Sequence, residues 1–268
     1  LLYAVINRAL IQPECFTSSD FTHLVCDMAY FSVSLKKFYE KAADRIFPEV
    51  KSCSSEEIIE LLSAYASMNV YHPELFYNSI ARLEKDLYEM QAERLVKTAE
   101  FFYETKIYAE SFLVNLSYRA ISIISSFEPS QALKLARYLS SMKIPMEDLL
   151  FSIKKHFQRT FSPSDITEFI DCAQKINSHK SLLDGFVPLI QDNAYAFTDR
   201  QAIKILQAYK SMRKKDLDLL SVFSNVFLMR MNEWDKDICL TVLSCYHFFD
   251  YYDQSFYYRL AENLVKNF

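Results

Sequence analysis

Glycine is almost absent from this chain, and that absence excludes several fold classes. A single Gly occurs among 268 residues. Glycine supplies the backbone conformations of hairpin turns and phosphate-binding loops, and Rossmann and P-loop folds need several glycines at defined positions. The sequence therefore argues against those folds, against a TIM barrel and against a hairpin-rich β fold.

Recognised catalytic and metal-binding patterns are also missing. The six Cys form no CxxC pair, no Cys/His cluster has zinc-ligand spacing, and neither HExxH nor GxSxG occurs. None of the five His pairs with a Cys or a carboxylate in a recognised pattern. We therefore expect a protein that is not an enzyme, with no catalytic residues, no metal and no cofactor.

The charge balance gives no global attraction to nucleic acid, because the net charge is −4. The apolar stretches are shorter than a transmembrane span, so no membrane partner is expected. The chain starts at Leu1 rather than Met. We expect residues to precede it, and any targeting segment would lie among them.

The chain does contain a repeat of about 37 residues along its whole length, most clearly in Leu61 to Phe76, LLSAYASMNVYHPELF. Each copy can be aligned on one anchor position, and the anchors lie 37, 37, 37, 34, 36 and 37 residues apart. They are Phe31, Met68, Thr105, Met142, Ile176, Met212 and Phe249. A period of this length is typical of stacked helical repeats, which usually bind extended partners.

Large apolar side chains recur at fixed offsets from the anchor, with the spacing of one helical face. Each copy therefore predicts two helices, A and B, joined by a turn just after the anchor. We predict one all-α domain over residues 1–268, an αα-hairpin repeat solenoid of about seven repeats of 34–37 residues, with residues 1–12 as the last helix of a preceding copy. Residues expected to be buried between helices are Leu62, Tyr65, Leu75, Leu139, Leu149, Leu206 and Leu219.

Local signals mark several helix ends. Ser54 with Glu57 predicts a capping box at the start of one helix A, and Thr198 with Gln201 predicts the same in the sixth copy. The fifth copy is three residues short, and Gly185 and Pro188 fall where its helix B should lie. We expect a kink or a late helix start there.

Copies of the form LLxAYAxMNVxxPELFxxI resemble heptatricopeptide and octotricopeptide repeats, and the related repeats of the FAST-kinase-like RAP proteins. The period is closest to the heptatricopeptide type, described mainly in apicomplexan parasites. This resemblance implies a mitochondrial matrix protein that binds organellar RNA, as part of a ribonucleoprotein such as the mitoribosome. The implied partners are ribosomal RNA or an organellar transcript and neighbouring proteins, without a small-molecule substrate.

Two surfaces are candidate RNA contacts. The first is a polar stripe on helix A at eight, five and one residues before the anchor, where side chains vary between copies as in base-reading repeats. The second is the A–B turn, where cations at successive repeats would line one edge and neutralise phosphates. Plain solvent exposure explains either pattern equally well. The predicted RNA-binding residues are Lys134, Arg137, Lys143, Lys175, Lys180, Lys204, Arg213, Lys214 and Lys215.

Aromatic residues crowd the last copy, from Tyr246 to Tyr258. They fit the packing of a terminal repeat, a protein partner or stacking on unpaired bases. The acidic net charge favours an alternative function, a protein-binding scaffold in a large mitochondrial assembly without RNA contact.

Overall fold

The computed structural model describes residues 2–266, so Leu1, Asn267 and Phe268 of the predicted domain lie outside the described residues. Within residues 2–266 the secondary structure is helical, with fifteen α-helices and no strand. The predicted fold class, an all-α helical-repeat solenoid, is confirmed. The helices group into two compact units, residues 1–123 and 124–268, here called unit 1 and unit 2. The prediction of one uninterrupted domain stays a prediction.

Each predicted copy is one helical hairpin. The seven A helices are α2 (Ser18–Tyr30), α4 (Ser55–Ser67), α6 (Ala92–Thr105), α8 (Pro129–Ser141), α10 (Pro163–Lys175), α12 (Asp199–Ser211) and α14 (Lys236–Phe248). The B helices are α3 (Lys36–Ile46), α5 (Pro73–Asp86), α7 (Glu110–Ser122), α9 (Glu147–Phe157), α11 (Phe186–Asp192), α13 (Leu217–Arg230) and α15 (Gln254–Lys266). Helix α1 (Leu2–Ile11) precedes them and packs on α3, as the B helix of a preceding copy would.

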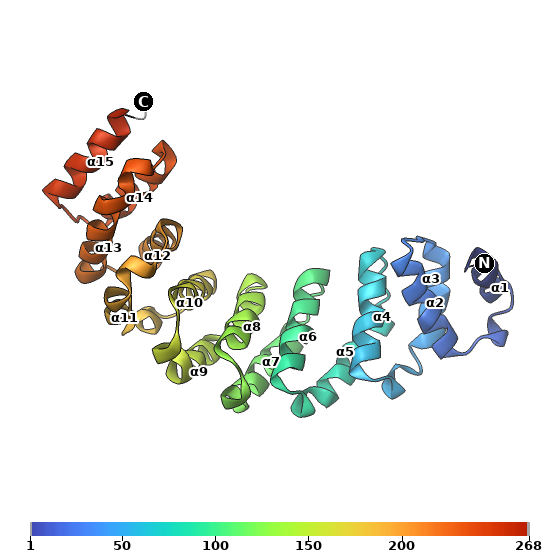
Figure 1. The fold of residues 1–268 in the computed structure, drawn as a ribbon. Coiled ribbons are helices and arrows are strands. Elements are labelled where there is room, and N and C mark those ends of the chain that lie inside the picture. Colours follow the sequence, from blue (N-terminus) through green and yellow to red (C-terminus); the bar gives the residue numbers. More distant parts are fainter. Residues whose placement is uncertain (1, 267–268) are drawn as a thin grey trace. The chain divides into compact units, whose positions relative to one another are not determined.

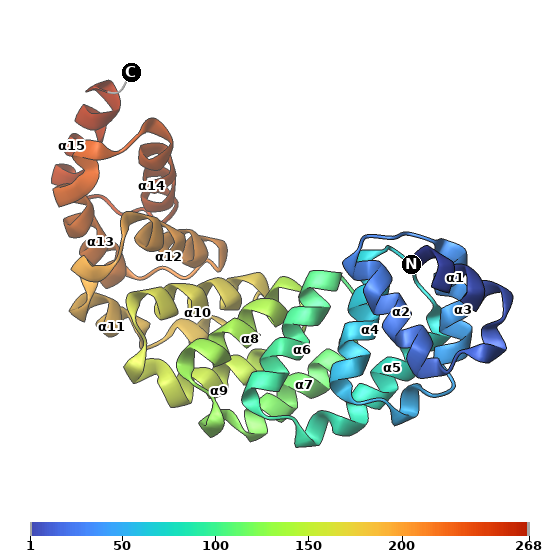
Figure 2. The ribbon, with the colours of Figure 1, turned by 45° about the vertical axis from the view of Figure 1, so that its right-hand side comes forward.

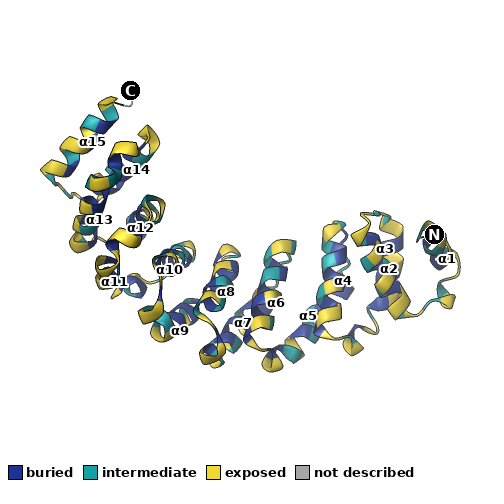
Figure 3. Ribbon diagram, in the orientation of Figure 1, coloured by how far each residue is buried: buried dark blue, intermediate teal, exposed yellow. Residues whose placement is uncertain are grey.

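Within each unit the A helices pack on A helices and the B helices on B helices, which makes two layers (Figures 1 and 2). The buried residues lie on the helix faces that meet one another, while the outer faces are exposed (Figure 3). All seven residues predicted to be buried are at most 1 % exposed, from Leu62 in α4 to Leu219 in α13. The apolar columns of the sequence are therefore the core of the two layers.

The turn after each A helix has one recurring backbone conformation. The anchor ends the helix, and the next residue has a positive φ of 49° to 60° in all seven copies. In the fourth copy, for example, Ile144 N–H donates to Leu139 O at 3.0 Å and Lys143 N–H donates to Ser140 O at 3.0 Å. These two bonds define the Schellman motif, which satisfies carbonyls left open at a helix end. At these seven turns the left-handed position is filled without glycine, by Ser32, Asn69, Lys106, Lys143, Asn177, Arg213 and Asp250.

The predicted helix starts are confirmed. Ser54 N–H donates to Glu57 at 2.7 Å and Glu57 N–H donates back to the Ser54 hydroxyl at 3.3 Å, and Thr198 and Gln201 form the same box. In the fifth copy a short 3-10 helix, Lys180–Leu183, replaces the first turn of helix B. Helix α11 starts only after Gly185, whose φ is +79°, and has seven residues. Pro188 lies in its first turn, where a missing N–H costs nothing.

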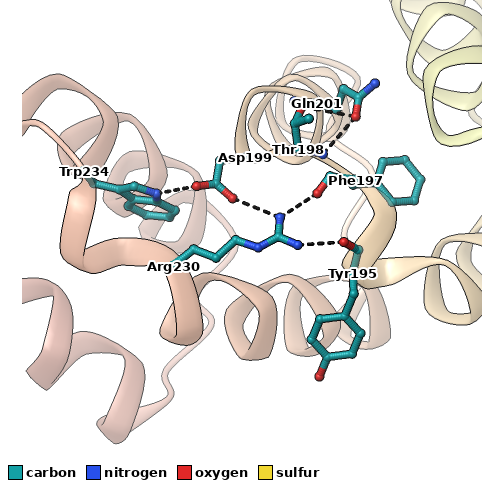
Figure 4. Close-up of polar contacts among 7 residues, drawn as sticks. All are labelled: Tyr195, Phe197, Thr198, Asp199, Gln201, Arg230 and Trp234. Atoms are coloured by element: carbon teal, nitrogen blue, oxygen red, sulfur yellow. Dashed lines mark hydrogen bonds and ion pairs between the residues drawn. The ribbon is translucent and has the colours of Figure 1, made fainter.

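A polar cluster closes the hairpin of α12 and α13 (Figure 4). The Arg230 guanidinium donates to Phe197 O at 2.6 Å and to Tyr195 O at 2.7 Å. Asp199 accepts from Arg230 at 3.3 Å and from the Trp234 indole N–H at 2.6 Å. Arg230 thus satisfies two carbonyls that precede helix α12. It also holds the C-terminal end of α13 against the N-terminal end of α12.

Candidate nucleic-acid interface

Five of the nine predicted RNA-binding residues lie at the A–B turns of unit 2. Lys143 follows the anchor of α8, Arg213 follows the anchor of α12, and both are exposed in the left-handed conformation. Lys215 is two residues further and is also exposed. Within residues 2–266, the side chains of these three cations make no ion pair or hydrogen bond in the structure.

The other two turn cations hold neighbouring turns together. Lys180 Nζ donates to Arg213 O at 3.1 Å, and Lys214 Nζ donates to Lys180 O at 3.4 Å. Lys214 also pairs with Asp184, and this hydrogen bond lowers the pKa of the Asp184 carboxyl. Lys180 and Lys214 therefore stabilise the turn edge, and within residues 2–266 Lys143, Arg213 and Lys215 are the turn cations of unit 2 that are exposed and make no side-chain hydrogen bond or ion pair.

The predicted stripe on helix A is a ladder of contacts between neighbouring helices. Arg137 of α8 lies 3.6 Å from the Glu168 carboxylate of α10. Asp171 of α10 pairs with Lys175 at 3.0 Å and with Lys204 of α12 at 3.3 Å. These pairs join α8, α10 and α12 and neutralise much of the stripe's positive charge.

The fourth stripe cation, Lys134, lies against an aromatic ring. Its ammonium is 5.6 Å from the Tyr138 ring centre, and the Arg137 guanidinium is 5.3 Å from the same ring. Cation–π contacts of this kind fix both side chains along the surface of α8. The predicted residues therefore fall into two groups, a paired stripe and a more open turn edge.

The two groups meet at one groove between successive turns. Its volume is about 400 Å³, and Lys143 and Lys175 both line it. Ile176 contributes apolar surface, and Asn177 lies at the left-handed position of the next turn. The groove thus combines two cations with apolar surface and with the carboxylate of Glu147, which accepts a hydrogen bond from His179 N–H. Two cations beside apolar surface suit a base next to its phosphate.

Sequence reasoning missed Lys154 of α9. Its ammonium donates to Ser181 O at 3.3 Å and lies 5.6 Å from the Phe186 ring. Burial lowers the pKa of Lys154, against the opposing effect of Asp184. The late start of α11 brings Ser181 and Phe186 to Lys154, so only the irregular fifth copy in three dimensions reveals this contact.

The aromatic residues of the last copy divide between core and surface. Tyr246, Phe249 and Phe256 are buried, which fits the packing of a repeat, while Tyr252 and Tyr258 are exposed. Phe248 is partly exposed, and Lys210 of α12 lies 5.6 Å from its ring. The packing interpretation therefore accounts for the first three residues alone.

The two units differ in charge. Unit 1 has 12 Lys and Arg against 17 Asp and Glu, a net charge of −5, whereas unit 2 has 18 against 17, a net charge of +1. The net charge of −4 is therefore concentrated in unit 1. The exposed turn cations of unit 2 belong to the less acidic part of the chain.

Three side chains that could in principle take part in catalysis, those of His72, Cys172 and Cys26, cap a helix or are at least partly buried. His72 lies 3.2 Å from Asp44, and its other ring nitrogen accepts from Leu75 N–H at 3.3 Å, so it caps α5. Burial raises the pKa of the Cys172 thiol to about 12 and that of Cys26 to about 11, which keeps both thiols protonated and weakly nucleophilic at neutral pH. In the described part of the chain, no three His, Cys, Asp or Glu side chains cluster to hold a metal.

Among residues 2–266, no helix has the length and apolar composition that crossing a membrane requires. No protein-family model matches the chain, and no curated protein sequence is significantly similar to it. The resemblance to heptatricopeptide repeats therefore stays a hypothesis that depends on the repeat pattern alone.

Proposed function

We propose that this chain is a non-catalytic repeat protein that binds RNA along the turn edge of unit 2, within a mitochondrial ribonucleoprotein such as the mitoribosome. The observation that carries the proposal is the set of exposed cations Lys143, Arg213 and Lys215 at the turns. Cations in a row on a repeat surface can neutralise successive phosphates. The mitochondrial and ribosomal parts of the proposal come from the resemblance.

The left-handed backbone at Lys143 and Arg213 supports a role beyond solubility. This conformation costs an ordinary residue roughly 1–2 kcal/mol, and Gly or Asn adopts it more easily. The equivalent turns at Asn69 and Asn177 have asparagine there. Strained residues often serve function, and a phosphate contact gives Lys and Arg such a purpose at these two turns.

The stripe on helix A has a supporting role in this proposal. Its ion pairs set the spacing of α8, α10 and α12, and thereby the spacing of the turns that follow them. The groove between Lys143 and Lys175 takes an unpaired base beside a contacted phosphate. Affinity then comes mainly from the turn edge, and the groove adds contacts to the bases.

The test is a triple variant that keeps the turns intact: Lys143→Asn, Arg213→Asn and Lys215→Gln. Asparagine accepts the left-handed conformation, so the fold should survive. The probe is a randomised single-stranded RNA of about 20 nucleotides, measured at about 50 and 200 mM salt. We expect weaker binding and a plot of log affinity against log salt that is flatter by about 2, which corresponds to three lost phosphate contacts.

Lys106→Asn is the matched control, because Lys106 has the same backbone conformation in acidic unit 1. It should leave RNA affinity unchanged. Equal affinity of the triple variant and the unaltered protein at both salt concentrations would refute the proposal. Cell fractionation and sedimentation of the tagged protein with mitochondrial ribosomes test its location.

The second candidate is a protein scaffold without RNA contact. The net charge of −5 on unit 1 and the neutralised stripe in unit 2 favour it. It predicts no measurable RNA affinity at low salt and the same absence in the triple variant. The RNA titration of the unaltered protein therefore separates the two functions.

A further inference from the structure

Two neighbouring turns of unit 1 carry exposed aromatic residues, where the turns after α8 and α12 of unit 2 carry exposed cations. Tyr71 and Tyr108 each lie three residues after their anchors, at the turns after α4 and α6, and are 69 % and 61 % exposed. Tyr77 in the first turns of α5 is 76 % exposed. Large exposed aromatics that gather in one place are typical of interaction sites.

These three tyrosines line one groove of about 520 Å³ between the two turns. The Tyr71 ring centre lies 4.8 Å from that of Phe76, which is buried, so the exposed Tyr71 ring packs against the core. Asn69 and Lys106, the left-handed residues of the two turns, line the same groove. The groove therefore offers apolar rings together with hydroxyl and amide donors.

The charged residues around the groove are mostly acidic, which disfavours binding of a polyanion. Glu74, Glu104 and Glu110 are exposed at the ends of the helices that flank the two turns. The cation that lines the groove, Lys106, lies over the Tyr103 ring at 4.8 Å. Since unit 1 also has a net charge of −5, RNA would meet repulsion here. A neutral or basic polypeptide would not.

We propose that the groove of Tyr71, Tyr77 and Tyr108 binds an extended, proline-rich segment of a partner protein. A polyproline II helix has three residues per turn and rises about 3.1 Å per residue, so equivalent side chains recur about every 9 Å. Packed helices lie about 8–10 Å apart. One proline face can therefore contact the turn at Tyr71 and the turn at Tyr108 in succession.

The chemistry of recognition follows from the same residues. Proline rings stack on tyrosine, as they do in aromatic-lined grooves that bind proline-rich segments. A polyproline II backbone makes no internal hydrogen bonds, so its carbonyl oxygens are free to accept from tyrosine hydroxyls or the Asn69 amide. Basic residues beside the prolines would be attracted by Glu74, Glu104 and Glu110.

Fluorescence anisotropy of the full chain with labelled decaproline tests this inference. A glycine–serine peptide of equal length is the negative probe, and decauridine is the RNA probe. We expect saturable decaproline binding, about tenfold or more weaker in Tyr71→Ala and in Tyr108→Ala, because buried aromatic contacts dominate such interfaces. Tyr71→Phe should retain most of the affinity through ring stacking.

Tyr88→Ala is the matched control, because Tyr88 is equally exposed in unit 1 but outside the groove. It should bind decaproline as the unaltered protein does. Three results would overturn the inference: no decaproline binding, equal binding of the glycine–serine peptide, or affinity that Tyr71→Ala and Tyr108→Ala leave unchanged. Decauridine binding that these two variants abolish would assign the groove to RNA instead.

Discussion

At the residue scale, the near absence of glycine has a structural cost at the turns. Each of the seven turns after the A helices has one left-handed position, and none of these seven holds Gly. The sequence did predict a turn at each of these places, because the anchor column precedes each one. It did not predict the left-handed backbone, since Lys and Arg carry no signal for it. Only the structure shows that Lys106, Lys143 and Arg213 have a left-handed backbone, which is unusual for Lys and Arg.

We predict that Lys143→Gly stabilises the fold by about 1 kcal/mol while removing a cation of the proposed interface. Lys155→Gly is the control, because Lys155 is exposed within α9, where glycine should destabilise by about 1 kcal/mol. Urea unfolding followed by circular dichroism measures both midpoints. A lower midpoint for Lys143→Gly would show that the left-handed backbone is not strained there.

A buried tyrosine recurs in the A helices, three residues before the anchor, and its hydrogen bond depends on the preceding copy. Tyr65 donates to Tyr39 O at 2.8 Å and Tyr246 donates to Leu220 O at 2.9 Å, each 26 residues back. Within residues 2–266, the equivalent Tyr209 hydroxyl is buried without a partner. The residue 26 positions back is Leu183, in the 3-10 segment that replaces the start of the fifth helix B.

Tyr65→Phe should therefore cost about 1 kcal/mol, because it leaves the hydrogen bond to Tyr39 O unmade. Tyr209→Phe removes no hydrogen bond and should be neutral or slightly stabilising. The two substitutions delete the same atom at equivalent positions, so each is the control for the other in thermal unfolding. Equal losses in both variants would mean that Tyr209 has an acceptor after all.

At the scale of elements, the periodic apolar pattern predicted the helices and their buried faces well. The sequence analysis nonetheless overlooked a column two residues before each A helix, which holds Phe16, Cys53, Met90, Phe127, Phe161, Phe197 and Trp234. These residues occupy the N′ position of a hydrophobic staple, and Phe16 lies 5.9 Å from Phe21 at N4. The motif joins a residue before the N-cap to a residue inside the helix. A search for apolar residues on one helical face finds only the second of these.

The candidate stripe shows a different limit of sequence reasoning. Arg137 and Glu168, or Asp171 and Lys204, are about one repeat apart in sequence, and only the packing of α8, α10 and α12 brings them together. Variable polar columns look the same whether side chains face a ligand or one another. The ladder therefore could not be distinguished from a recognition surface before the helices were placed.

Leu149→Ala tests the packing between the layers of unit 2. Leu149 is fully buried at the start of α9, so its truncation leaves a cavity and should cost about 2–5 kcal/mol. Phe151→Ala is the control, because Phe151 is 43 % exposed two residues later and should cost far less. Comparable unfolding midpoints for the two variants would contradict the assigned register of α9.

At the scale of the whole molecule, charge and aromatic surface are distributed unequally between the units. Unit 2 has a net charge of +1 and exposed cations at its turns, whereas unit 1 has a net charge of −5 and exposed tyrosines at the corresponding turns. The same backbone turn is thus used with two side-chain chemistries. Taken together, the two proposals assign RNA binding to unit 2 and protein binding to unit 1.

Cross-linking of the full chain to single-stranded RNA tests this division directly. Ultraviolet cross-links mapped by mass spectrometry should lie within residues 124–268, near Lys143, Arg213 and Lys215, because phosphate contacts bring RNA to the cations rather than to the acidic unit. Their yield should fall steeply between about 50 and 200 mM salt. Tyrosine is readily cross-linked, so Tyr71, Tyr77 and Tyr108 provide an internal control: cross-links concentrated there would mean that stacking rather than charge selects the RNA, and that the roles of the two units are reversed.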